Sequence, residues 1–453
     1  MEKQQESLVI TLDNRFSVIL YPDTFFWVLA ESSRVKQAKA LCKEIYTDSL
    51  KQQLEADLGL LRSSVAIDFI ELHPTSGCNM NCAYCYVPRG HRMEQKLMRQ
   101  EDIEEILCKL FDWIEKAGRG MRRVIFHGGE PLLAKDCIFS IIDKYHREVE
   151  FGIQTNGTLL TEEDAKFIKE RNVHISFSLD GPPAEANDIV RHHWDGRGTF
   201  DKVVRAINLF KGYEWVGVIV TITKHNVDHL DLIARSFYDW EVPSALFNPV
   251  SPSSANAIDL MPSLEALTFG YKKLIDTLID LNGRSDSKRL VVDNVESLIV
   301  AILTSNMRVL YCHMSPCGAG RLVYVISSNG DVYPCSEFLQ FKEFRCGNIF
   351  KDSVANILSS EACKMLRCRT VDMINGCNSC AYRQICGANC PASVYGLYRT
   401  MYAKAPYCAY KKEIINHIFK KIAEGGIDVA YKLVSRSFEE KLRKSEKLVH
   451  VER

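Results

Sequence analysis

The sequence predicts an α/β protein in which a parallel sheet is covered on its outside by helices. Strand-like and helix-like segments alternate regularly over residues 65–248, and such alternation is typical of parallel strands joined by crossover helices. Hydrophobic residues make up 46% of the chain and charged residues 25%, the balance of an ordinary globular protein. The length of 453 residues suggests about three domains.

The predicted strands and helices follow one another in a fixed order. Strands are expected at residues 65–72, 123–127, 150–155, 173–179, 217–223 and 245–248. Helices are expected between them at residues 100–116, 137–147, 161–171 and 200–210. Thr161 followed by three acidic residues is a typical helix N-terminus. An active site is expected at the carboxyl ends of the strands, where the connecting loops meet.

Segments on either side of this alternation predict further elements. Residues 8–20 resemble two strands around an Asp13–Asn14 turn, and helices are expected at residues 24–30 and 35–55. Near the C-terminus, Asn329–Gly330 predicts a hairpin turn between residues 322–326 and 332–333. Residues 411–453 alternate charge at helical spacing and predict a solvated helical tail.

Charge and hydropathy exclude several classes of protein. The 57 basic residues equal the 57 acidic ones, whereas a nucleic-acid-binding protein usually carries a basic surplus. Charge interrupts the N-terminal apolar stretch too early for a signal peptide, and no apolar run reaches the roughly 18 residues of a membrane span. We therefore expect a cytoplasmic protein without nucleic-acid or membrane partners.

The 17 cysteines are too many for chance in a chain without an export signal. In a reducing compartment they favour metal or redox chemistry over disulfides. Eleven fall into two groups, and six lie singly at unpatterned spacings (Cys42, Cys108, Cys137, Cys346, Cys363 and Cys368). The six are best explained as small buried hydrophobic residues.

The spacing of the grouped cysteines indicates which metal they bind. Cys78, Cys82 and Cys85 form C-x3-C-x2-C. Three close thiolates suit a [4Fe–4S] cluster whose fourth iron stays open, whereas structural zinc takes four ligands. The later group contains eight cysteines (Cys312, Cys317, Cys335, Cys377, Cys380, Cys386, Cys390 and Cys408). Eight thiolates are the right number for two fully ligated clusters, and zinc is the alternative for this group.

These motifs resemble those of a known enzyme family. The C-x3-C-x2-C triple, with aromatic Tyr84 before its third cysteine, is similar to the cluster motif of radical S-adenosylmethionine (SAM) enzymes. The later cysteines resemble the SPASM extension, which carries two auxiliary [4Fe–4S] clusters. The likeness runs from about residue 65 to residue 410. It implies a partial six-unit (β/α) barrel, SAM and three [4Fe–4S] clusters as cofactors, and a flavodoxin- or ferredoxin-type electron donor.

The resemblance also implies a SAM site at the strand ends. Gly128, Gly129 and Glu130 match the segment that binds the amino group of SAM, and glycines there permit close approach of the backbone. Asn156 matches a position near the ribose, although a turn-forming Asn before Gly is an alternative. Ser178 and Arg191 match positions that contact the SAM carboxylate, which the planar guanidinium fork of arginine suits. His127, His192 and His193 receive no role.

For the auxiliary clusters, the resemblance implies an interleaved ligand set. The first cluster would take Cys312, Cys317, Cys335 and Cys390, and the second would take Cys377, Cys380, Cys386 and Cys408. Cys312 is the least certain ligand, and Cys346 is its substitute. Without Cys312, the first cluster would have an open iron able to bind a substrate thiolate. Such thiolate ligation would staple a loop-rich segment that has little apolar core of its own.

One position separates this chain from the sulfatase maturases of the family. Those enzymes carry an acidic residue directly after the cysteine that corresponds to Cys335, and Ser336 stands there in this chain. Glu337 follows one residue later and would point elsewhere if the local chain were extended. The departure weakens the sulfatase hypothesis without excluding it.

The sequence divides into four predicted domains: an N-terminal α+β domain (1–62), the radical SAM partial barrel (63–305), the SPASM domain (306–411) and a helical tail (412–453). The first is similar to leader-peptide recognition domains, which add an extended peptide to a sheet edge. A structural cap on the barrel is the alternative.

The leading hypothesis is therefore an oxidoreductase that matures a ribosomally made precursor peptide. The resemblance implies that SAM is cleaved to a 5′-deoxyadenosyl radical, which takes a hydrogen atom from a residue of the precursor. A thioether from a precursor cysteine to a neighbouring carbon is the specific prediction, and a carbon–carbon crosslink fits the cysteines equally. Maturases of the sulfatase (formylglycine) or quinohemoprotein type are the second hypothesis, and an iron–sulfur electron-transfer protein is a third of another class.

Overall fold

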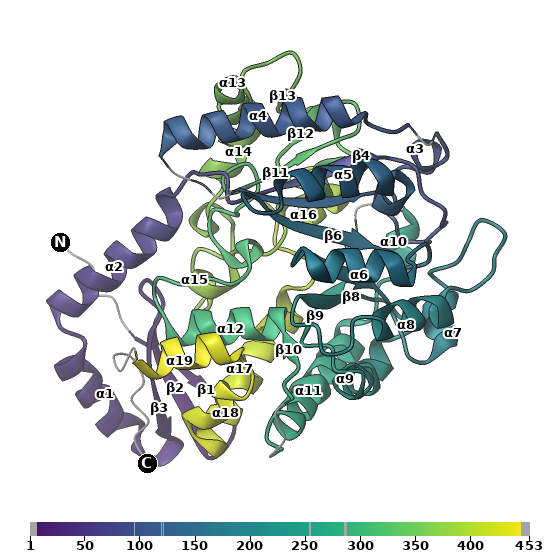
Figure 1. Ribbon diagram of the computed structural model, residues 1–453. Coiled ribbons are helices and arrows are strands. Elements are labelled where there is room, and N and C mark those ends of the chain that lie inside the picture. The colour runs from purple at the N-terminus through teal and green to yellow at the C-terminus, as the bar shows by residue number, and fades with distance from the viewer. Residues whose placement is uncertain are drawn as a thin grey trace.

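A ten-stranded sheet organises most of the chain (Figure 1). The computed structural model describes residues 7–444 apart from residues 95, 119, 121, 253–254 and 285–287. The first six residues of the predicted N-terminal domain and residues 445–453 of the predicted tail lie outside this range. Along the sheet the strand order is β10-β9-β8-β7-β6-β5-β4-β11-β12-β13.

Six consecutive strands, β4 to β9, lie side by side in chain order and are all parallel. Their bounds are Phe69–Thr75, Arg123–Gly128, Glu150–Thr155, His174–Ser178, Val216–Ile222 and Ser244–Pro249. The short β10 (Val291–Val292) continues the parallel sheet at one end. The fold is thus the α/β partial barrel that the sequence predicts, and every expected strand is present within a few residues.

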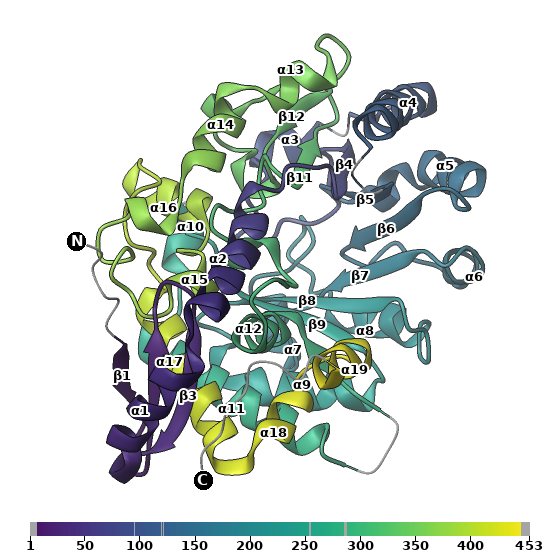
Figure 2. The ribbon, with the colours of Figure 1, turned by 90° about the vertical axis from the view of Figure 1, so that its left-hand side faces the viewer.

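Helices cover the outer side of the curved sheet (Figure 2). The crossover helices are α4 (Gln100–Ala117), α5 (Lys135–Tyr145), α6 (Glu162–Glu170), α8 (Phe200–Asn208) and α9 (Leu230–Asp239). Outward-facing strand residues such as Ile70, Leu72, Val124 and Phe126 are buried in the core beneath them. Because strand side chains alternate between faces, Glu71, His73 and His127 face the barrel interior instead. The Thr161 N-cap of α6 is confirmed, since its Oγ1 accepts from Asp164 N at 3.2 Å.

The N-terminal segment forms an antiparallel sheet of three strands: β1 (Leu8–Thr11), β2 (Phe16–Tyr21) and β3 (Phe26–Glu31). The expected hairpin is confirmed, with Asp13 Oδ1 accepting from Arg15 N at 2.8 Å in the turn. The expected helix at residues 24–30 is wrong. Six residue pairs join β3 to β2, and the Phe-Trp-Val-Leu run of β3 has high strand propensity.

The single helix expected at residues 35–55 is also wrong in detail. Two helices, α1 (Val35–Ile45) and α2 (Asp48–Ser63), replace it. The break falls at Thr47, whose hydroxyl accepts from Leu50 N at 3.3 Å and so starts a new helix.

The C-terminal segment extends the central sheet on its other side. Strand β11 (Val323–Ile326) pairs parallel with β4, and β12 (Asp331–Tyr333) and β13 (Gly347–Asn348) follow antiparallel. The Asn329–Gly330 hairpin is confirmed, with Gly330 at φ +84°. The short helices beyond the hairpin are α13 (Val354–Leu358), α14 (Glu361–Cys368), α15 (Arg383–Cys386) and α16 (Pro391–Tyr398).

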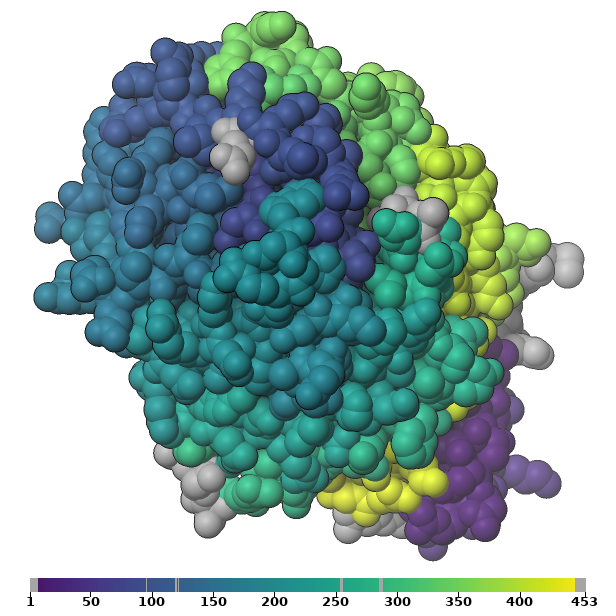
Figure 3. Space-filling model, turned by 90° about the vertical axis from the view of Figure 1, so that its right-hand side faces the viewer, coloured from purple at the N-terminus to yellow at the C-terminus, as the bar shows by residue number. Residues whose placement is uncertain are grey.

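The expected solvated tail is instead a packed helix followed by two shorter ones. Helix α17 (Cys408–Gly425) buries Ile414, Ile415, Ile418, Phe419 and Ile422, and α18 (Ile427–Tyr431) and α19 (Arg436–Lys444) follow it. Helix α17 contacts both α11 (Leu264–Leu281) and the N-terminal sheet. Figure 3 shows the yellow C-terminal surface directly beside the purple N-terminal one. The tail therefore joins the N-terminal domain to the barrel.

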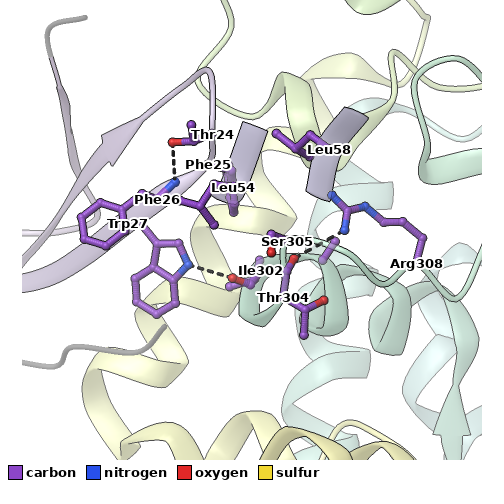
Figure 4. Close-up of a pocket in the computed structure, with 11 residues that line it drawn as sticks. Thr24, Phe25, Phe26, Trp27, Leu54, Leu58, Ile302, Thr304, Ser305 and Arg308 are labelled. Carbon is purple, nitrogen blue, oxygen red and sulfur yellow. Dashed lines mark hydrogen bonds between the residues drawn. The ribbon is translucent and has the colours of Figure 1, made fainter. Parts of the chain in front are cut away.

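The N-terminal domain also packs against α12 (Asp293–Leu303) of the barrel. Trp27 Nε1 donates to Ile302 O at 2.8 Å (Figure 4). Leu54 and Leu58 of α2 line the same contact, and the cavity that remains measures about 20 Å³, little more than the space of one water molecule. The groove between β3 and α2 is thus filled by the chain itself.

Among the described residues, no helix is both long enough and apolar enough to cross a bilayer.

Candidate active site

The three closely spaced cysteines lie in the loop that follows β4, at the carboxyl end of the barrel. The segment at residues 190–194 holds this loop in place. Three hydrogen bonds join the two: Asn81 N to His192 O (2.9 Å), Ala83 N to Val190 O (2.9 Å) and Trp194 Nε1 to Cys78 O (2.9 Å). Segments more than 100 residues apart in sequence therefore fix the positions of Cys78, Cys82 and Cys85.

The surroundings of these thiols are buried, and they contain the guanidinium groups of Arg92 and Arg191 as well as the carboxylates of Glu130 and Asp180. Burial raises the pKa of the Cys78 thiol to about 12 and that of Cys82 to about 11. Burial raises the pKa of Cys85 as well, while Arg92 and Arg191 oppose the rise. Nε and one terminal nitrogen of Arg92 are buried without a hydrogen-bond partner in the described part of the chain. Three thiols beside two guanidinium groups fit a thiolate-bound iron–sulfur cluster.

Gly128 and Gly129 at the end of β5 allow this strand to contact the cysteine loop directly. Gly129 N donates to Thr75 O at 3.1 Å, and Glu130 N donates to Gly77 O at 2.8 Å. A Cβ at Gly129 would lie 2.0 Å from Gly77 O. The two glycines are thus needed for a contact between two backbones, in addition to any contact with a ligand.

The replacement Gly129→Ala tests this contact. We expect it to displace the cysteine loop, to destabilise the protein by about 1–3 kcal/mol as overpacking does, and to lower iron incorporation. The melting temperature and the iron content per chain measure both effects. Gly59→Ala is the matched control, because α2 leaves open space around Gly59. A Gly129→Ala protein with wild-type iron content and stability would show that the position of the cysteine loop does not require glycine here.

Glu130 links the ends of β5 and β6. Its carboxylate is fully buried and accepts from Thr155 Oγ1 at 2.6 Å, from Asn156 N at 2.8 Å and from Leu132 N at 3.0 Å. Burial raises the pKa of Glu130, and these hydrogen bonds oppose the rise. A carboxylate offers about four acceptor positions, so room is left for one further donor.

Asn156 connects the same region to the cysteine loop. Its Nδ2 donates to Asn79 Oδ1 at 2.8 Å and lies 4.0 Å from Cys78 Sγ. Its Oδ1 accepts from Thr158 N at 3.0 Å, the bond of a local turn. The turn interpretation therefore describes its local bonds, and the expected position near the ribose stays a prediction.

Arg191 belongs to a buried chain of polar groups that starts in the cysteine loop. Its NH1 donates to the Tyr84 hydroxyl at 2.7 Å, and this hydroxyl donates to Asp180 Oδ2 at 2.6 Å. Thr221 N donates to the other oxygen of Asp180 at 2.8 Å. Arg191 Nε is buried and has no hydrogen-bond partner among the described residues, so it is available to a carboxylate ligand.

The role of Asp180 was missed from the sequence, although the strand was predicted to end there. Ser178, two residues earlier, lies at the end of β7 on the face opposite the buried Ile175 and Phe177. Glu130, Asn156 and Arg191 thus lie around the three cysteines, and the place of Ser178 in the site stays a prediction.

The structure also brings together the cysteines assigned to the first auxiliary cluster. Burial raises the pKa of Cys312 and Cys335, and nearby thiols add to the rise, with Cys317 and Cys390 acting on Cys312 and Cys390 on Cys335. The substitute candidate lies elsewhere, since Cys346 Sγ is 3.5 Å from Cys363 Sγ in a buried pair. The geometry therefore favours Cys312 over Cys346.

The second auxiliary set is gathered in the same way. Burial raises the pKa of Cys386 to about 11, and Cys408, Cys380 and Cys377 each add to the rise. Lys411 opposes it. This buried lysine interacts with Cys312 as well as Cys386, and its Nζ lies 2.7 Å from His313 Nε2. A cation between the two thiol sets was not predicted, because α17 was taken for a solvated tail.

Two carboxylates face the barrel interior beside Cys335. Residues Ser336–Phe338 form a 3₁₀ turn, so the extended chain on which the expectation for Glu337 depended is not the conformation of this segment. Burial raises the pKa of Glu337, and the nearby Ser251 opposes the rise. Ser336 donates to Glu71 of β4. The interior thus holds acidic groups although the position directly after Cys335 is a serine.

Comparison with known proteins gives two family matches. Residues 72–237 match the radical SAM superfamily, and residues 317–381 match the SPASM iron–sulfur cluster-binding domain. An uncharacterized protein of Archaeoglobus fulgidus is 36% identical over 414 residues, which cover 91% of this chain and 94% of that protein.

Two further similarities are to a sulfatase-maturating enzyme and to a protein solved with a bound precursor peptide. A cysteine-type anaerobic sulfatase-maturating enzyme of Clostridium perfringens is 26% identical over 370 residues, covering 77% of this chain and 95% of its own. The structure of Streptococcus suis SuiB bound to the precursor peptide SuiA superposes with a TM-score of 0.60 at 14% identity, covering 89% of this chain and 99% of that one.

Proposed function

This chain belongs to the radical SAM superfamily and carries a SPASM domain, and from this premise we propose that it matures a ribosomally made peptide by forming a thioether crosslink. As a member of the family it is an enzyme that uses SAM and [4Fe–4S] clusters. The observation that carries the proposal is the convergence of Cys78, Cys82 and Cys85 with Glu130 and Arg191 at the strand ends.

In the proposal, Cys78, Cys82 and Cys85 hold the cluster that binds SAM. When bound by these residues, the cluster and SAM would supply the radical chemistry that removes a hydrogen atom from the substrate. Glu130 accepts from the SAM ammonium with its remaining lone pair, in the segment begun by Gly128 and Gly129. Asn156 lies near the ribose.

Arg191, with Ser178, pairs with the SAM carboxylate. The Tyr84 hydroxyl and Asp180 fix the guanidinium, so Arg191 is held in place before SAM arrives. The unpartnered Nε supports this assignment.

The later cysteines hold the auxiliary clusters as the resemblance implies. Cys312, Cys317, Cys335 and Cys390 hold the first, and Cys377, Cys380, Cys386 and Cys408 hold the second. Four thiolates close each cluster, and Lys411 compensates charge between them. A flavodoxin- or ferredoxin-type donor supplies the electron for SAM.

A peptide substrate is supported by the similarity to SuiB, which extends over 89% of this chain. A leader peptide would bind at the free edge of β1, since the groove between β3 and α2 is filled by α12. Leu8 and Val9 of that strand are about two-fifths exposed, at 41% and 39%. Strand addition there would supply main-chain hydrogen bonds.

The sulfatase-type alternative keeps specific support. The Clostridium relative is a sulfatase-maturating enzyme, and Glu71 and Glu337 place carboxylates in the barrel interior beside Cys335. Either carboxylate can accept the proton that a substrate thiol loses in both reactions. Thioether formation and formylglycine formation could therefore use the same proton acceptor, and the two functions are distinguished by the substrate.

The deciding experiment is incubation of the reconstituted enzyme, SAM and dithionite with each candidate substrate: any small cysteine-containing peptide found to be encoded beside the gene, and a sulfatase peptide. We expect a product that has lost two hydrogens and no longer reacts with thiol reagents. Leu8→Lys with Val9→Lys is expected to weaken peptide binding by about tenfold and to spare SAM cleavage without peptide. Exchange of sulfur for oxygen, or activity only on a sulfatase peptide, would favour the alternative.

A further inference from the structure

The barrel interior holds a second group of metal-ligating side chains, separate from all eleven grouped cysteines. Glu71 and His73 on β4 and His127 on β5 each offer one ligand atom, and these atoms lie within 4.8 Å of one another. Two histidines and one carboxylate are the ligand set of mononuclear sites that leave coordination positions open. None of the three residues has a role predicted from the sequence.

An irregularity in the sheet brings the two histidines together. Leu72 pairs with Phe126 and Thr75 with Gly128, so His73 and Pro74 stand opposite the single residue His127. Such a bulge re-aims side chains and is common beside active sites. The two imidazole rings stack with centroids 5.2 Å apart. Glu71 joins them because it lies two residues before His73, on the same face of β4.

His73 provides an independent sign of a missing ligand. Its side chain is 4% exposed, and its Nε2 is buried without a hydrogen-bond partner among the described residues. A buried polar atom without a partner lowers the stability of a protein. A metal ion bound at this nitrogen would remove that cost.

The other two groups are oriented by neighbours, as ligands in metal sites usually are. The Tyr86 hydroxyl lies 3.2 Å from His127 Nδ1, which leaves Nε2 of that ring available. Ser336 donates to Oε2 of Glu71, which leaves the other carboxylate oxygen available. The nearby Glu337 carboxyl interacts electrostatically with Glu71, so the interior favours a cation.

We propose that Glu71, His73 and His127 bind one divalent transition-metal ion, such as Mn²⁺, Fe²⁺ or Zn²⁺. Two nitrogen ligands disfavour Ca²⁺ and Mg²⁺, which take oxygen. The open positions face the interior of the barrel, where they would take an oxygen or sulfur donor of the residue to be modified. The ion would hold that residue in front of the SAM site. This holding role rests on the proposed function, whereas metal binding itself does not depend on which peptide is the substrate.

Manganese titration of the iron-loaded, oxidised holoenzyme tests the site. The six-line electron paramagnetic resonance signal of free Mn²⁺ decreases when the ion binds, and oxidised [4Fe–4S] clusters give no signal. We expect one Mn²⁺ per chain beyond the cluster iron. His73→Asn with His127→Gln should weaken binding about 100-fold or more, the upper range seen when supporting residues alone are lost.

The matched control removes two histidines outside the interior, His146→Gln with His229→Gln, and should bind Mn²⁺ as the wild type does. Iron content shows whether each variant has folded. If the double histidine variant does not fold, Mn²⁺ binding by Glu71→Gln is measured in its place. Wild-type binding weaker than about 1 mM, or equal binding by the folded ligand variants, would overturn the proposal.

Discussion

Replacing Cys78, Cys82 and Cys85 together with alanine is expected to abolish the formation of 5′-deoxyadenosine. These three are the thiols that the loop after β4 gathers at the strand ends, and no other grouped cysteine is assigned to that cluster. The eight later cysteines lie in separate sets, so about eight of twelve irons should remain bound. Chromatography of the nucleoside and an iron assay measure the two results.

The matched control removes three unpatterned cysteines, Cys108, Cys137 and Cys368, in the same way. We expect this protein to keep its iron and its SAM cleavage, because none of the three lies in an assigned set. Full nucleoside release by the Cys78/Cys82/Cys85 variant would refute the cluster assignment. Loss of all twelve irons would show instead that the three sets do not form independently.

Arg191→Lys is expected to weaken SAM binding by about 100-fold. Lysine keeps the charge but loses the fork that holds the Tyr84 hydroxyl and presents Nε to a carboxylate. Truncating one partner of a buried charged hydrogen bond costs about 2–5 kcal/mol, and 100-fold corresponds to about 2.7 kcal/mol. Equilibrium dialysis with labelled SAM measures the loss.

Tyr84→Phe should weaken SAM binding less, by about tenfold. Arg191 remains in this variant but loses the hydroxyl group that orients it. Arg197→Lys is the control, since Arg197 forms an exposed ion pair with Asp195 on the same segment. If Arg191→Lys bound SAM as the wild type does while keeping its iron, the buried chain from Tyr84 to Arg191 would have no part in the SAM site.

The barrel could be predicted from the sequence because its signals are local. Each strand from β4 to β9 carries apolar residues in a short run or in alternation with polar ones and ends at a turn, and each crossover helix repeats its apolar residues at helical spacing. Strand β3 could not be distinguished in this way from a helix. Its run from Phe26 to Ala30 is apolar on both faces, and only its pairing with β2 decides between the two structures.

The tail was misjudged for a related reason. Charges in α17 are regular enough to suggest a solvated helix, yet Ile414, Ile418 and Ile422 recur at intervals of four residues and form a buried face. The apolar period was therefore visible, but its partner surface is made by the N-terminal sheet and α11. Such a surface has no signature in the sequence.

The candidate site shows the same division between local and long-range information. Cysteine spacing and the Gly-Gly-Glu segment are local patterns, and the structure brings their residues together. Asp180, Arg92 and Lys411 have no motif of their own and reach the thiols only through the fold. Glu337 faces the interior because the chain turns at Ser336. The alternation of side chains in an extended strand, which was assumed for this segment, does not apply to such a turn.

We claim above all that the thiols of Cys78, Cys82 and Cys85 hold a cluster at which SAM is reduced. The most direct measurement is 5′-deoxyadenosine release by anaerobically reconstituted wild-type protein given SAM and dithionite. We expect release of the nucleoside together with methionine, even without a peptide. Protein that carries its full iron content and releases no nucleoside under these conditions would contradict the claim.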